Sequence, residues 1–161
     1  MTTCREIQAE EGVLLREATT WRLIGLLFEC PQDQWLDQVT MLGREVSDAT
    51  LAAAAEAAGR EASPGLYHST FGPGGPAPPR EVSYRRGVLP GPALAELRSL
   101  YEAFAYRPSV EEPADHVAVE AGFVGYLVLK QAYALARGHD DQVSVCRIAE
   151  RRFIHEHLGH L

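Results

Sequence analysis

Apolar residues recur at the spacing of an α-helix along almost the whole chain, and this periodicity constrains the fold more than any other feature. Between Arg5 and Glu29, for example, Leu14, Ala18 and Trp21 are three or four residues apart and so share one helical face. No run of alternating apolar and polar residues is long enough to indicate a strand. The sequence therefore predicts an all-α fold, a single helical bundle of about six helices.

The expected helices follow from this spacing and from the stop signals between them. We expect helices over residues 5–29, 34–46, an alanine-rich segment capped by Ser47 or Asp48, 93–106, 113–137, and from 140 onward. The fifth of these is apolar on nearly every side, which indicates a central, buried helix. In the last one Val143, Cys146 and Phe153 should face the core, whereas Glu150 should face solvent.

A segment rich in proline and glycine separates the third and fourth of these helices. Residues 72–79 read Gly-Pro-Gly-Gly-Pro-Ala-Pro-Pro, and prolines remove backbone donors while glycines cost backbone entropy, so this stretch cannot be helical. We expect one long loop over about residues 72–92. Loops of that length inside compact domains are uncommon and are often functional.

Size and hydropathy place the chain among globular proteins. Its 161 residues, 46% of them apolar, suffice for one domain over residues 1–161. The longest apolar run, residues 122–129, is far below the roughly 20 residues that cross a bilayer. The N-terminus has no apolar core behind a basic start, so we expect no export signal, no stable membrane insertion and a cytoplasmic protein.

Charge and cysteine content exclude several function classes. A formal net charge of -7 argues against nucleic-acid binding, which needs clustered Lys and Arg, and weakly favours basic partners. The three cysteines are widely spaced and form no CxxC pair, so neither a disulfide framework nor a cysteine zinc site is expected. We expect no cofactor and no bound metal.

Polar residues gather before the central apolar run. Glu112, His116 and Glu120 are spaced i, i+4, i+8, and in a continuous helix they would project from one face with Asp115 beside them. Such a cluster either satisfies buried polar groups or forms a binding surface. The residue pattern alone leaves both possibilities open.

An enzyme is not expected, because catalysis by this cluster would also need a nucleophile or metal and an oxyanion donor. One alternative is a metal-dependent hydrolase or metal sensor that uses His116 with Glu112, Glu120 and, in one version, His157. A third interpretation is a helical adaptor without a peptide groove.

Several linked segments resemble one known family. They are Trp21 to Phe28 followed by Pro31; Tyr67 with Phe71-Gly72-Pro73; Pro79-Arg80-Glu81-Val82-Ser83-Tyr84; Leu100 to Tyr106; and Glu112-Pro113-Ala114-Asp115-His116 with Glu120. In this combination the chain resembles the TorD/DmsD/NarJ family of cytoplasmic chaperones, which assist maturation of molybdenum-containing redox enzymes.

The resemblance implies a non-catalytic protein that binds the twin-arginine signal peptide and the apo catalytic subunit of a molybdoenzyme, and so delays export until the cofactor is loaded. The positions that match the family's peptide-binding region are Phe71, Gly72, Pro73, Glu81, Ser83, Tyr84, Glu112, Pro113, Asp115 and His116. To these we add Glu120 from the polar cluster, and Tyr101 and Phe104 as an apolar wall. Carboxylates beside an aromatic groove suit guanidinium groups followed by an apolar stretch.

The C-terminus departs from the family pattern. Relatives continue with a Trp-Pro-containing stretch and a further helix, whereas this chain ends at Leu161. An uncovered apolar face on the central helix would favour a homodimer.

Overall fold

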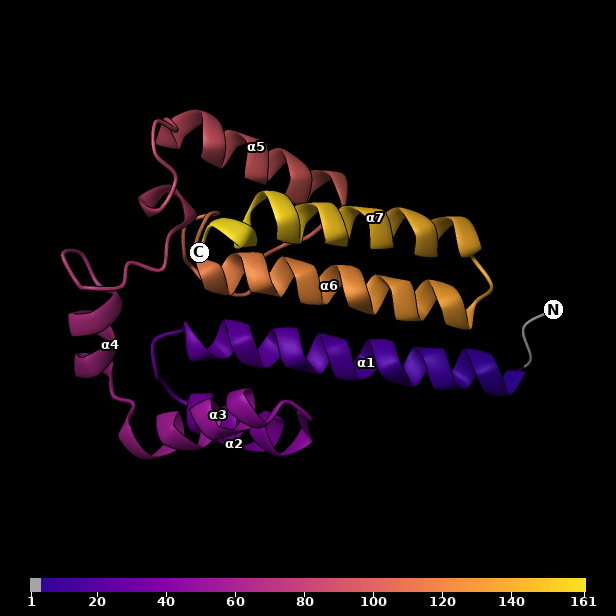
Figure 1. The fold of residues 1–161 in the computed structure, drawn as a ribbon, viewed down its shortest axis with the longest axis horizontal. Helices are drawn as coiled ribbons and strands as arrows, with labels where there is room; N and C mark the ends of the chain where they lie inside the picture. The colour runs from indigo at the N-terminus through magenta and orange to yellow at the C-terminus, as the bar shows by residue number, and fades with distance from the viewer. Residues whose placement is uncertain (1–3) are drawn as a thin grey trace.

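The computed structural model describes residues 4–161, which fold into seven α-helices with no β-strand in that range (Figure 1). The helices are α1 (Cys4–Leu27), α2 (Trp35–Glu45), α3 (Ala49–Glu61), α4 (Pro64–Phe71), α5 (Pro90–Ala103), α6 (Val117–Ala136) and α7 (Asp140–Glu156), with two short 3-10 helices, η1 (Glu81–Ser83) and η2 (Leu158–His160). The predicted all-α fold is confirmed, with one helix more than expected. None of the described helices is both long and apolar enough to cross a bilayer.

Helix α6 lies between α1 and α7 and forms the centre of the bundle, as its all-round apolar sequence predicts (Figure 1). The side chains of Phe123, Val124 and Leu127 are almost completely buried. Gly125 lets α1 approach closely, because a Cβ atom there would lie only 3.3 Å from the Cβ of Trp21. Helices α1, α6 and α7 therefore form the framework on which the other segments pack.

Helices α2 and α3 pack on the side of α1 opposite to α6 (Figure 1). The buried residues Leu23 and Val39 form part of a second apolar cluster there. The indole Nε1–H of Trp35 donates a hydrogen bond of 2.7 Å to the carbonyl of Leu26, which fixes the turn that follows α1. Helix α3 begins at the predicted cap, since the side chain of Asp48 accepts a hydrogen bond from the Leu51 amide.

Helix α4 is the element that the periodicity of the sequence did not reveal. It is only eight residues long, too short for a clear apolar stripe. Its signal is local: the Ser63 side chain accepts a hydrogen bond from the amide of Leu66, and Pro64 occupies the first helical position. Its last residue, Phe71, packs against Phe28 with ring centroids 5.4 Å apart.

Three helix boundaries, two in α5 and one in α6, differ from the expected ones. Helix α5 begins at Pro90 rather than near 93, because proline is tolerated in a first turn. It ends at Ala103 rather than near 106, and Ala105 has a φ of 56°, which a right-handed helix cannot continue through. Helix α6 begins at Val117, so the expectation of a helix from about residue 113 is wrong.

The long loop between α4 and α5 is attached to the chain segment that precedes α6. The amide of Glu81 donates to the carbonyl of Asp115 at 2.9 Å, and the amide of Val117 donates to the carbonyl of Pro79 at 2.9 Å. These bonds satisfy backbone groups that a loop would otherwise leave to solvent. The loop thus becomes part of the structure around the polar cluster.

Helix α7 begins at Asp140 as expected, and Gly138 precedes it with a φ of 68°. The orientation expected for Glu150 is wrong. Its side chain is buried and accepts a hydrogen bond from the side-chain amide of Gln131 on α6. A carboxylate at this position packs inward because α6 supplies a polar partner there.

Candidate functional site

The segment from Glu112 to His116 precedes α6 and contains a separate turn, in which the His116 amide donates to the Pro113 carbonyl at 3.0 Å. His116 is the N-cap residue, and its Nδ1 accepts a hydrogen bond of 3.1 Å from the amide of Ala118. The expectation that Glu112, His116 and Glu120 share one face of a continuous helix is therefore wrong. Glu112 still lies near the ring, with 4.0 Å between its Oε2 and the Nε2 of His116. Burial, and then the positive charge of Arg80, lower the pKa of His116 to about 4, so the ring is neutral at pH 7.

Asp115 lies in the interior with no exposed surface, and its partners come from the long loop. Its Oδ1 accepts a hydrogen bond of 2.6 Å from Nε of Arg80 and forms an ion pair with Nη2 of the same guanidinium, also at 2.6 Å. Its Oδ2 accepts a longer bond of 3.3 Å from the amide of Val82. The guanidinium group of Arg80 already binds this carboxylate. A guanidinium group of a ligand could bind it only by displacing Arg80.

The other predicted residues divide into buried and accessible ones. Glu81, Glu120 and Tyr101 are buried, and the hydroxyl of Tyr101 donates a 2.7 Å bond to the carbonyl of Ala114. The remaining predicted residues lie as follows: Gly72 is buried, Phe71, Phe104, Glu112 and Pro113 are half-buried, and Pro73, Ser83 and Tyr84 are exposed. Of the buried members, Glu81 and Glu120 lie close together beneath the loop, while the accessible members are distributed over the surface.

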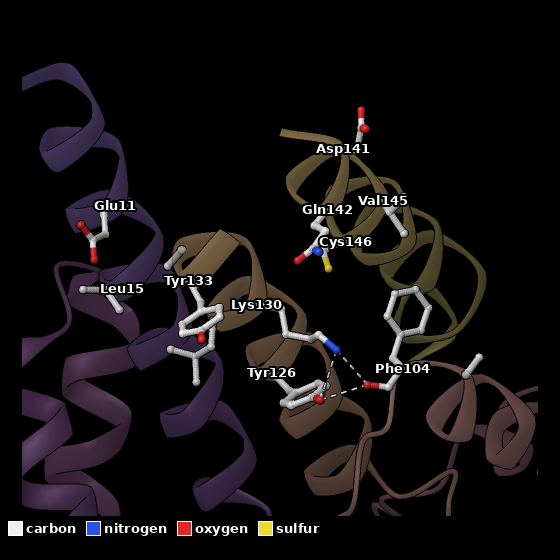
Figure 2. A pocket seen from close by; sticks show the side chains of 13 residues that line it. Glu11, Leu15, Phe104, Tyr126, Lys130, Tyr133, Asp141, Gln142, Val145 and Cys146 are labelled. Atoms are coloured by element: carbon white, nitrogen blue, oxygen red, sulfur yellow. Dashed lines mark hydrogen bonds between the residues drawn. The ribbon is translucent and has the colours of Figure 1, made fainter. Parts of the chain in front are cut away.

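An apolar groove of about 920 Å³ lies along the exposed side of α6, between α1, α7 and the end of α5 (Figure 2). We call this the α6 groove; its main lining residues are Leu15, Phe104, Tyr126, Leu129, Tyr133 and Val145. Leu129, Tyr133 and Val145 are each about half exposed, at 48%, 59% and 56%. Apolar side chains so exposed in a concave surface are typical of a binding site rather than of a solvated helix face.

The cationic side chain of Lys130 lines the α6 groove. The Nζ of Lys130 donates to the carbonyl of Phe104 at 3.1 Å and lies 3.4 Å from the hydroxyl of Tyr126 (Figure 2). That hydroxyl also donates to the Phe104 carbonyl at 3.0 Å. These bonds hold the segment after α5 against α6 and keep the Phe104 ring at the groove's edge.

A second apolar hollow of about 730 Å³ continues beyond Phe104, between α5 and α7. It shares Phe104 and Val145 with the α6 groove and adds Ile148, which is 67% exposed. Sequence reasoning missed both hollows. The available signal was a set of apolar residues off the core stripe, Leu129 and Tyr133 on α6 and Val145 and Ile148 on α7.

An acidic hollow of about 780 Å³ lies where the chain turns from α1 into α2. Its carboxylates come from Glu29, Asp33, Glu111 and Glu112, and no Lys or Arg is among its lining residues within the described range. Glu29 is paired with Arg22 at 2.7 Å. Burial, and the charge of Glu29, contribute to raising the pKa of Glu112. A cation bound here would relieve that repulsion.

The α6 groove and the acidic hollow border the same short segment. Phe104 lines the groove and Val110 lines the hollow, so six residues of chain separate them. A chain of that length spans at most about 21 Å. The two hollows are therefore within reach of a single extended peptide of similar length.

The residues suggested by the sequence for the alternative metal site come together only in part. Within residues 4–161, the group of His, Cys, Asp and Glu side chains that could offer three ligand atoms is Glu81, Glu120 and His157, whose atoms lie within 4.8 Å of one another. His116 and Glu112 are not part of it. Of the suggested residues, Glu120 and His157 therefore lie together, with Glu81 as the third member of the group.

Comparison with protein families matches residues 41–160 to the family described as Nitrate reductase delta subunit. The matched range runs from α2 to η2 and includes the acidic segment and helices α5, α6 and α7. No match was found among curated proteins or among solved structures.

Proposed function

Because this chain belongs to the nitrate reductase delta subunit family, we propose that it is a chaperone that binds the twin-arginine signal peptide of a molybdenum-containing oxidoreductase. The family comprises non-catalytic chaperones of molybdoenzyme maturation, and membership implies contact with a catalytic subunit of the nitrate reductase type. This agrees with the resemblance drawn from the sequence. The signal peptide is the finer part of the proposal, and its support comes from the two kinds of hollow on the surface.

The observation that carries the proposal is an acidic hollow and an apolar groove on either side of residues 104–110. A twin-arginine leader offers two guanidinium groups followed by an apolar stretch. Guanidinium groups favour carboxylates that are not already neutralised, and Asp33, Glu111 and Glu112 provide them. An apolar stretch favours a concave apolar surface such as the α6 groove.

This proposal divides the predicted site residues by role. Glu112 and Phe104 contact the peptide, since each lines one of the hollows. Asp115 and His116 shape the segment that carries Glu112, and they act from the interior. A leader held across both hollows is inaccessible to the export machinery, which delays export while the client is loaded.

Titration of a fluorescent twin-arginine peptide tests both hollows separately. Val145→Glu places a charge in the α6 groove and should weaken binding about tenfold or more, which is 1.4 kcal/mol or more. Met41→Glu is the matched control, because Met41 is exposed to a similar extent, 54% against 56%, and lines neither hollow. If the two variants bind the peptide with equal affinity, the α6 groove is not the peptide-binding site.

The acidic hollow has its own test. Glu111→Gln with Glu112→Gln should weaken binding about two- to thirtyfold, because exposed charge pairs contribute roughly 0.2–1 kcal/mol each. Glu45→Gln, an exposed carboxylate on α2, should leave the affinity unchanged. A peptide with alanines in place of both arginines should lose most of the difference between these variants. Binding that is insensitive to all these changes would refute the proposed site.

A second copy of this chain is the competing occupant of the α6 groove. In that case peptide affinity would fall as protein concentration rises, and Val145→Glu would yield a monomer. Sedimentation of both variants, with and without peptide, distinguishes a homodimer interface from a peptide groove.

A further inference from the structure

Three polar side chains from distant parts of the chain meet in the interior beneath the long loop. Glu81 comes from η1, Glu120 from α6, and His157 from the end of α7. The exposed fractions of these residues are 1%, 0% and 3%. We call them the Glu–Glu–His cluster. It is separate from the acidic hollow and includes neither Glu112 nor Asp115.

Glu81 is fully engaged as an acceptor. Its Oε1 accepts a 2.7 Å bond from Nη1 of Arg85, and its Oε2 lies 3.0 Å from Nδ1 of His157. Burial opposes ionisation of Glu81, but the hydrogen bonds with His157 and Arg85 outweigh it and lower the pKa of Glu81. Glu81 is therefore the ionised member of the cluster.

Glu120 is in the opposite situation. Among residues 4–161, no N–H or hydroxyl group donates to either oxygen of its side chain. An ionised carboxylate without a donor is very costly in the interior, whereas a protonated carboxyl can donate its own hydrogen to Glu81. Burial and the adjacent charge of Glu81 raise the pKa of Glu120.

The charges around the cluster are consistent with a single proton shared by its two carboxyl groups. Arg85 balances Glu81, and the nearby Asp115 is already balanced by Arg80. Tyr101, the other titratable side chain close to Glu120, has a pKa that burial raises further above its usual range, so it remains neutral. Within residues 4–161, a second ionised carboxylate here would have only the imidazole of His157 to balance it, and that ring is a cation only when it is protonated.

A metal ion fits the same cluster less well. Three ligands do not close a tetrahedral site, and Arg85 already holds one oxygen of Glu81. A metal-bound histidine normally donates its other N–H to an acceptor, yet the Nε2 of His157 has no partner among the described residues. When Nδ1 of His157 carries the hydrogen and donates it to Glu81, Nε2 is an acceptor without a donor. Burying an unpaired acceptor costs less free energy than burying an unpaired donor.

We infer that Glu81 and Glu120 share a single proton and that, with His157, they form a pH-sensitive clasp joining the long loop and the C-terminal segment to α6. The loop end of this clasp carries the exposed Ser83 and Tyr84. Its other end, His157, lines the apolar hollow between α5 and α7. Loss of the proton places two like charges together in the interior and opens the clasp.

The direction of the pH effect follows from the raised pKa of Glu120. In the opened state its pKa returns towards the ordinary value of 4.5, so opening releases a proton. Opening therefore becomes more favourable as pH rises, by about tenfold per pH unit, until the pH reaches the native pKa. Below pH 4.5 this dependence disappears, because both states carry the proton.

Carboxyl-carbon NMR tests the shared proton directly. The Glu120 carboxyl should keep the chemical shift of a protonated acid at about pH 7, at which Glu112 is ionised. Glu120→Gln, whose amide can still donate to Glu81, identifies the signal by removing it. An ionised Glu120 at this pH would overturn the inference. So would a stoichiometric metal ion in chelator-free protein that is lost in Glu120→Gln.

Hydrogen exchange tests the clasp itself. Relative to the intrinsic exchange rate, protection of the Glu81 amide should fall about tenfold per unit between about pH 7 and pH 9 in the wild type and stay constant in Glu120→Gln. Glu112→Gln is the control and should behave like the wild type. A wild-type protection factor that does not change with pH would refute the switch. If Glu120→Gln does not fold, the wild-type NMR and exchange data still decide between these outcomes.

Discussion

Removing the cation of the Arg80–Asp115 pair should cost more stability than removing its anion, because only the anion is fully buried. The Asp115 side chain is 0% exposed, whereas that of Arg80 is 32% exposed. After Arg80→Ala, the carboxylate remains in the interior with only the 3.3 Å bond from the Val82 amide. After Asp115→Ala, the guanidinium group can turn towards water.

The magnitudes follow from these environments. An interior charge that loses its partner costs roughly 3–5 kcal/mol, which we expect for Arg80→Ala. For Asp115→Ala we expect about 1.5–3 kcal/mol, the range of the charge-assisted hydrogen bonds that are lost, because Arg80 regains solvent. The double variant leaves no orphaned charge, so its cost should fall short of the sum by about 1–3 kcal/mol.

Urea unfolding of the wild type, both single variants and the double variant gives the coupling energy. The exposed pair Glu56–Arg60 is a matched control, because its N–O distance is also 2.6 Å but its side chains are 75% and 59% exposed. Its coupling should be below about 0.5 kcal/mol. The reasoning fails if Asp115→Ala costs as much as Arg80→Ala, or if the two pairs have equal coupling.

Three further changes test other parts of the structure. Gly43→Ala should destabilise the protein by about 1–3 kcal/mol, because its Cβ would lie 2.8 Å from the Cβ of Ala55 where α2 meets α3; an unchanged melting temperature would contradict this contact. Asp48→Ala should cost about 1 kcal/mol in urea unfolding, since it removes the acceptor for the Leu51 amide at 2.8 Å. The free energy of unfolding of the wild type should fall as pH rises from 6 to 8, because its native state holds a proton that the unfolded state releases, and this fall should be smaller in Glu120→Gln. Equal slopes in the two proteins would argue against a protonated Glu120.

Local pattern was sufficient for most of the fold. The spacing of apolar residues predicts α1, α2 and α7 within a few residues, and the all-round apolar sequence of α6 predicts its central position. Helix α4 escaped this reasoning because eight residues are too few to display a period, although Ser63 and Pro64 mark its start. The early end of α5 depends on the left-handed conformation of Ala105, which no spacing rule predicts.

The candidate site was predicted less completely. The helical-face argument for Glu112, His116 and Glu120 assumes that all three lie within a helix, whereas His116 caps it. The acidic hollow also draws on Glu29 and Asp33, which are about 80 residues away from Glu112 in the sequence. No local pattern connects these carboxylates, because the turn between α1 and α2 brings them together.

The sequence by itself determines that this chain is helical, roughly where its longer helices lie and which helix is central, since backbone preference and the burial of apolar stripes act over a few residues. Only the tertiary structure decides which carboxylates face water and which lie inside with a cation or a proton. That outcome depends on partners far along the chain, such as Arg80 for Asp115 and His157 for Glu81. The ionisation of a side chain depends on the solvent and charge around it, and the folded packing sets both.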